Sequence, residues 1–217
     1  FEDRSSGRIP IQEYLSAHGP ERIDLMVSTH THEDHICGLM EAARLLPPAE
    51  LWQTLPPDYY PGLRPLDVSA AQNPSQSKFL RALNDYITLC SLTEAHGGTV
   101  RALHAGNSIP LCPGLCAEVL APSAADCAAL EQQTSELYAE TDSAAFLQKL
   151  SALDARMNNY SLILRLDYQG TRILLPGDTN RAGYGGIADT EVGAHLFKVR
   201  LSPGNAGHCG DLRGDVH

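Results

Sequence analysis

The spacing of apolar residues predicts both helices and strands in the first half of the chain. Helical spacing predicts helices at 10–18, 36–46 and 80–90. Short apolar runs predict strands at 23–29, 51–55 and 99–104. Strands and helices therefore alternate here, which indicates a protein of the mixed α/β class.

In the second half of the chain, the spacing of apolar residues predicts two hairpins. The first is expected at 108–120, turning at Pro113-Gly114, and the second joins 161–168 to 172–175 across Gln169-Gly170. Between them, 123–157 carries apolar residues at helical spacing, which predicts a helical insertion covering the site. The second hairpin ends at Gly177-Asp178-Thr179, so Asp178 is expected at the end of a strand.

Composition narrows the class of protein. The 217 residues are 43% hydrophobic and 19% charged, which fits one globular domain spanning 1–217. A net charge of -10 does not favour binding of duplex nucleic acid, and no apolar run approaches the roughly 18 residues of a membrane span. Six cysteines are too sparse for a disulfide scaffold, so we expect reduced thiols and favour a cytoplasmic protein.

The strongest chemical signal is the run His30-Thr31-His32-Glu33-Asp34-His35, which follows the first predicted strand. Imidazole nitrogens and carboxylate oxygens are ligands that zinc and its first-row neighbours prefer. In an extended loop His30 and His32 project to the same side, while Asp34 and His35 lie one turn further on. One loop can therefore serve two metal ions. The alternative interpretation of the run is a polar surface loop.

This run resembles the His-x-His-x-Asp-His signature of the metallo-β-lactamase superfamily. The chain is most similar to the competence-type branch through THTHEDHICGL at 29–39, NNYSLILRLDYQGTRILLPGD at 158–178 and LFKV at 196–199. The resemblance implies a four-layer αββα sandwich that here lacks some N- and C-terminal elements. It also implies a pair of Zn²⁺ ions, with Mn²⁺ or iron as alternatives.

The resemblance assigns roles to individual residues. His30 and His32 would bind one metal, Asp34 and His35 a second, and Asp178 would bridge both, with Asp34 and Asp178 as the catalytic carboxylates. Asn159 stands near the place of a further histidine ligand, although an amide oxygen is a poor substitute for imidazole and a turn or capping role is favoured. The implied function is a metal-dependent hydrolase acting on a small molecule or a phosphodiester.

The chain departs from this family at its end. The branch continues after LFKV with a His-His-Gly motif, where this sequence has Arg200-Leu201-Ser202-Pro203-Gly204, and His208 is the nearby histidine that would have to replace the last ligand. A degenerate, non-catalytic domain or a gene fragment with an incomplete metal site is therefore the alternative to an active hydrolase.

Overall fold

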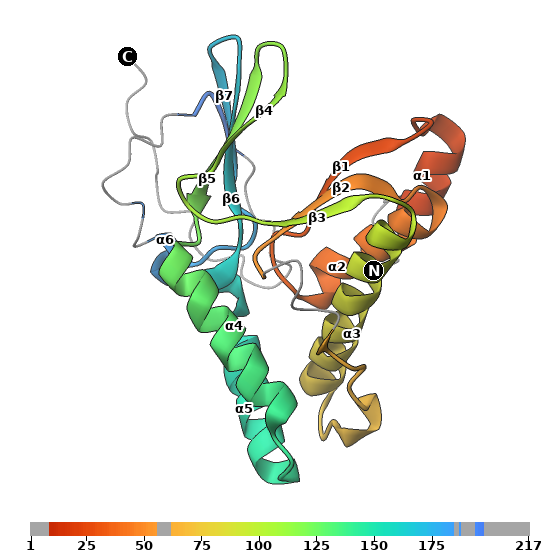
Figure 1. Ribbon diagram of the computed structural model, residues 1–217, viewed down its shortest axis with the longest axis vertical. Helices are drawn as coiled ribbons and strands as arrows, with labels where there is room; N and C mark the ends of the chain where they lie inside the picture. The colour runs from red at the N-terminus through yellow and green to blue at the C-terminus, as the bar shows by residue number, and fades with distance from the viewer. Residues whose placement is uncertain (1–8, 56–61, 185–186, 188–193, 198–217) are drawn as a thin grey trace.

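The computed structural model describes residues 9–55, 62–184, 187 and 194–197, and its strands form two sheets (Figure 1). The first sheet has the order β1-β2-β3 and the second the order β4-β5-β6-β7-β8. Helices lie beside both sheets, so the mixed α/β class predicted from the sequence is confirmed.

The first sheet is parallel, and a helix connects each pair of successive strands. Its strands are β1 (Ile23–Val27), β2 (Pro48–Gln53) and β3 (Thr99–Ala102). The connecting helices are α2 (Glu33–Leu45) and α3 (Pro74–Ala95), and α1 (Ile11–His18) and the short 3-10 helix η3 (Val68–Ala70) complete this half. The predicted elements are confirmed in type.

Several boundaries differ from the sequence prediction: β2 begins at Pro48 instead of 51, and two helices begin earlier than predicted. Helix α3 begins at Pro74, six residues before the predicted start, because Asn73 caps it by accepting a hydrogen bond from the backbone N–H of Gln76. Helix α2 begins at Glu33, so Asp34 and His35 lie in its first turn. The expectation of a ligand-bearing loop that precedes the helix is therefore wrong for the second half of the histidine run.

The second sheet is built from the two predicted hairpins. Its strands are β4 (Ser108–Cys112), β5 (Leu115–Ala121), β6 (Ile163–Tyr168) and β7 (Thr171–Leu175), which are antiparallel, and β8 (Leu196–Phe197), which runs parallel to β7. The turn after β6 has Gln169 and Gly170 at positive φ, as a tight hairpin requires.

The predicted insertion separates β5 from β6 and forms two helices. Helices α4 (Ala124–Ala139) and α5 (Ser143–Arg156) form an antiparallel pair that projects below the second sheet in Figure 1. The 3-10 helix η4 (Met157–Tyr160) leads from α5 into β6, and α6 (Arg181–Tyr184) follows β7. Asp142 caps α5 through the backbone N–H of Ala145, as expected.

Alternate residues of the first sheet enter two different cores. Trp52 on β2 is fully buried among side chains of the second sheet, including Val119 and Leu164. Its neighbour Leu51 faces the other way, into a core shared with α2, α3, α4 and α5. The first sheet therefore lies between a layer of helices and the second sheet.

None of the helices in the described part of the chain is long and apolar enough to cross a membrane.

Candidate metal centre

The histidine run lies where β1 ends and α2 begins. His30 follows the strand and is 3% exposed, and His32 occupies the position before the first helical residue with extended backbone. The backbone carbonyl of His32 accepts hydrogen bonds from the N–H groups of His35 and Ile36, at 3.0 Å each. This first turn of α2 brings the ring of His35 back to within 4.1 Å of the ring of His30, measured between centroids.

Asp178 approaches from the second sheet, just after the end of β7. Gly177 has φ +59°, a left-handed conformation that glycine adopts without a Cβ clash. A Cβ at this position would lie 3.1 Å from the Cβ of Ser161 and 3.2 Å from that of Thr29. The turn that carries Asp178 is therefore packed tightly against the residue that precedes His30.

The two sheets are joined beside this point. The backbone N–H of Leu162, just before β6, donates to the carbonyl of Thr29, just after β1, at 2.8 Å. This bond fixes the end of β1 relative to the hairpin that delivers Asp178. Residues that are far apart in sequence thus meet at one rigid corner of the fold.

The structure brings together three of the predicted ligands. One ligand atom from each of His30, His35 and Asp178 lies within 4.8 Å of the other two. The Nε2 of His35 is 3.3 Å from a carboxylate oxygen of Asp178, whose side chain is 15% exposed. Tetrahedral zinc with bonds of 2.0–2.1 Å places its ligand atoms about 3.3 Å apart. The separation of His35 and Asp178 is therefore compatible with two ligands of one ion.

The other two predicted ligands lie at the edges of this cluster. The Nδ1 of His32 is 3.0 Å from the Nε2 of His30, so these two nitrogens face each other across a gap that one ion would span. Asp34 is less engaged, because its carboxylate lies 3.9 Å from the Nε2 of His35 and its side chain is 62% exposed.

The outer nitrogens of two histidines support the same interpretation. The Nδ1 of His30 lies 3.2 Å from the hydroxyl of Thr29 and 3.2 Å from that of Ser161, and the Nδ1 of His35 lies 3.4 Å from the Thr29 hydroxyl. Metal-binding imidazoles usually make such a hydrogen bond with the nitrogen that does not face the ion. The residues present therefore fit a bound metal.

The two weaker sequence candidates have different outcomes. Asn159 lies in η4, and its Oδ1 is buried without a hydrogen-bond partner among the described residues, as is that of Asn158. Asn159 is two residues from Ser161, which contacts His30, but its buried Oδ1 makes no hydrogen bond to a histidine of the described residues. His208 lies outside the described residues, as do Lys198 and Val199 of the LFKV segment.

Three residues around the histidines had no role in the sequence prediction. Thr29 contacts the rings of His30 and His35, Ser161 contacts that of His30, and Asp154 contacts that of His32. Thr29 and Ser161 directly adjoin predicted motifs, so their position was a usable signal. Asp154 lies within the helical insertion, where nothing in the local sequence marks it.

A pocket of about 280 Å³ opens beside this centre. It is lined by His32, Glu33, Asp34, Ser75, Lys78, Phe79 and Asp154. Lys78 supplies its positive charge and lies 3.5 Å from Glu33. The pocket shares His32 and Asp34 with the candidate centre, so a molecule bound there would lie next to the metal ligands.

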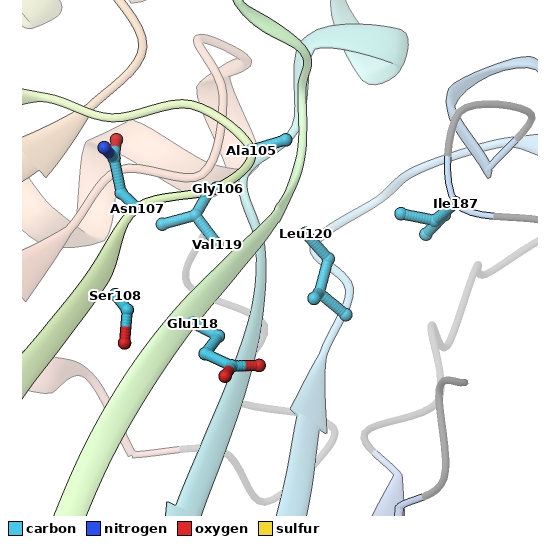
Figure 2. A pocket seen from close by; sticks show the side chains of 8 residues that line it. All are labelled: Ala105, Gly106, Asn107, Ser108, Glu118, Val119, Leu120 and Ile187. Carbon is cyan, nitrogen blue, oxygen red and sulfur yellow. The ribbon is translucent and has the colours of Figure 1, made fainter. Parts of the chain in front are cut away.

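A second pocket, of about 310 Å³, has a different character. Figure 2 shows it between the loop before β4 and strand β5, with Ile187 facing Leu120 across it. Its polar side chains are engaged in the fold, since Asn107 accepts a hydrogen bond from the backbone of His104 and Glu118 pairs with Arg165. It contains none of the predicted ligands.

Comparison with known proteins does not assign the chain to a family. No protein-family model matches the chain, and no curated protein matches it. The candidate centre is therefore defined by the residues described above.

Proposed function

We propose that this protein is a metal-dependent hydrolase of the metallo-β-lactamase type. The observation that carries the proposal is the convergence of His30, His35 and Asp178 from two sheets onto one point, with ligand atoms within 4.8 Å of one another. The resemblance of the histidine run and of the 158–178 segment to that superfamily supports it. So does the arrangement of helices, first sheet and second sheet, which is compatible with an αββα sandwich.

In this proposal the ligands divide between two Zn²⁺ ions. His30 and His32 would hold the first through the nitrogens that lie 3.0 Å apart. Asp34 and His35 would hold the second, and Asp178 would be the ligand that the resemblance assigns to both. When bound, such ions act as Lewis acids that activate water near neutral pH and stabilise charge on the attacked group; Mn²⁺ or iron would serve in their place.

The residues of the chain then have distinct tasks. The hydroxyls of Thr29 and Ser161 orient the ring of His30. The side chain of Asp178 is 15% exposed, and its carboxylate would orient the attacking water. Asp34 is exposed towards solvent, where a carboxylate accepts and passes on the proton released by the water.

The substrate that we propose is a small phosphodiester. The preference for a phosphodiester rests on the resemblance to the competence-type branch. The preference for a small molecule rests on the pocket of about 280 Å³ and on the net charge of -10, which disfavours a long polyanion. Lys78 lies in the pocket wall, where its ammonium group would meet a phosphate oxygen.

The test is hydrolysis of bis(p-nitrophenyl) phosphate by protein reconstituted with Zn²⁺ or Mn²⁺. We expect a rate that rises with metal and falls to background in the His35→Ala variant. The control is His96→Ala, because His96 is exposed and bonds only to a helix carbonyl in the contacts described, at 3.0 Å from Leu92. Metal binding without hydrolysis of this ester or of a lactone would instead favour the non-catalytic alternative.

A further inference from the structure

The helical insertion contacts the candidate centre through Asp154 of α5. Its Oδ1 lies 3.2 Å from the Nε2 of His32, and its backbone carbonyl lies 3.3 Å from the same nitrogen. Asp154 belongs to the last turn of α5, and His32 precedes α2. A helix that is inserted into the second sheet thus contacts a predicted metal ligand attached to the first.

The carboxylate of Asp154 is held in place from its other side. The hydroxyl of Ser75, in the first turn of α3, donates to its Oδ2 at 3.0 Å. Close by, the amide of Gln76 donates to the hydroxyl of Ser151 at 3.1 Å, so α3 and α5 are joined at two points. Asp154 therefore has a fixed orientation in which one oxygen faces His32.

Local helix preferences do not explain an acidic residue at this position. Carboxylates are unfavourable near the C-terminal end of a helix, where the last carbonyl groups carry partial negative charge, and α5 ends two residues later at Arg156. The side chains of Asp154 and His32 are only 26% and 21% exposed, so solvent screens their interaction less than that of a surface pair.

The contact decides which nitrogen of His32 carries the proton. A carboxylate accepts a hydrogen bond, so the nitrogen that faces it, Nε2, must be the N–H. The lone pair of a neutral His32 is then on Nδ1, the atom that lies 3.0 Å from the Nε2 of His30. The lone pair is thus directed at the place where the ion is expected. The edge of the Phe79 ring also supports the imidazole, at 5.8 Å between centroids.

We propose that Asp154 is a positioning residue that fixes the tautomer and orientation of His32 for metal binding. This inference deepens the proposed function and rests on it. Loss of a carboxylate partner behind a ligating imidazole typically weakens metal binding about 10–100-fold. The insertion is thereby part of the metal centre.

The first test reads the tautomer without any metal. Long-range ¹H–¹⁵N spectra of the metal-free protein should show the Nε2–H form of His32. The Asp154→Ala variant keeps only the backbone carbonyl of residue 154, at 3.3 Å, as an acceptor for Nε2, so we expect its spectrum to shift towards the Nδ1–H form relative to the unaltered protein. The control is Ser151→Ala, which removes the other bridge between α3 and α5 and should leave the spectrum unchanged. Asp154→Asn keeps the volume of the side chain and an acceptor oxygen, so this variant can be measured if the alanine variant does not fold.

The second test measures affinity for Co²⁺ and Zn²⁺ by chelator competition, with the Co²⁺ absorption spectrum as a report on ligand geometry. We expect binding about 10–100-fold weaker in Asp154→Ala, an intermediate loss in Asp154→Asn, and no change in Ser151→Ala. Equal affinity and an equal spectrum in all variants would overturn the inference, as would an equal loss in Ser151→Ala, which would make the effect structural.

The two tests separate the inference from the proposed function. If the unaltered protein binds no metal, the proposed function fails, while the metal-free spectra still decide whether Asp154 controls His32. If the protein binds metal and the His32 tautomer is the same with and without Asp154, the proposed function survives and the role of Asp154 is refuted.

Discussion

Gly177 provides a sharp test of how tightly the corner beside Asp178 is built. Its φ of +59° is left-handed, and a Cβ there would meet Ser161 and Thr29 at 3.1 and 3.2 Å. Gly170 is also left-handed, at φ +84°, but a Cβ there meets nothing within 4 Å. Substitution by alanine at either position therefore adds the same kind of backbone strain, and only position 177 adds crowding.

The expected magnitudes follow from these two contributions. We expect Gly170→Ala to lower the free energy of unfolding by about 1–2 kcal/mol through left-handed backbone strain. Gly177→Ala should lower it by about a further 1–3 kcal/mol, because Ser161 and Thr29 must move to accept the new methyl group. The hydroxyls of Ser161 and Thr29 both contact the ring of His30, so movement of these two residues should weaken metal binding.

Urea unfolding of the metal-free proteins measures the first effect, and chelator competition for Zn²⁺ the second. Gly170→Ala should retain the metal affinity of the unaltered protein. If both variants lose equal stability and bind metal equally well, Gly177 does not pack against the residues around His30, and the rigid corner described above is refuted.

Three further predictions concern the insertion, its cap and the cysteines. Leu150 on α5 is fully buried, so Leu150→Ala should lower the free energy of unfolding by about 2–5 kcal/mol in urea, and a loss below 1 kcal/mol would contradict the packing of α5. Ser123 caps α4 in a reciprocal box with Asp126, so Ser123→Ala should cost about 0.5–2 kcal/mol in the same assay, and no loss would argue against the box. Burial raises the pKa of Cys90 to about 12 and that of Cys127 to about 11, so at pH 8 both stay protonated and should react with iodoacetamide far more slowly than exposed Cys112, as followed by mass spectrometry; modification of Cys90 as fast as Cys112 would contradict its burial.

Local signals in the sequence predicted most of the elements. The alternation in SLILRLDY and the Gln169-Gly170 turn specify a hairpin without outside help, because a strand with one buried face has a strong period of two. The start of α2 was harder to place. The polar residues Glu33 and Asp34 interrupt the apolar period, yet acidic residues are favourable in the first turn of a helix, and that preference extends the helix to Glu33.

The candidate site was predictable where its residues form a motif and unpredictable where they do not. The spacing of His30, His32 and His35 was visible directly, and Asp178 gained its significance from the hairpin before it. The role of Asp154 could not be predicted from the sequence, because a single aspartate on an amphipathic helix has no local pattern that indicates its partner. Only the packing of α5 against α3 brings it to His32.

Metal content per chain tests the central claim most directly. Protein reconstituted with Zn²⁺ and freed of excess metal would be measured by elemental analysis beside the variants Asp178→Ala and His96→Ala. We predict about two equivalents in the unaltered protein and in His96→Ala, as a dinuclear centre requires, and a clear loss in Asp178→Ala. The absence of bound metal from the unaltered protein, or an undiminished content in Asp178→Ala, would contradict the account.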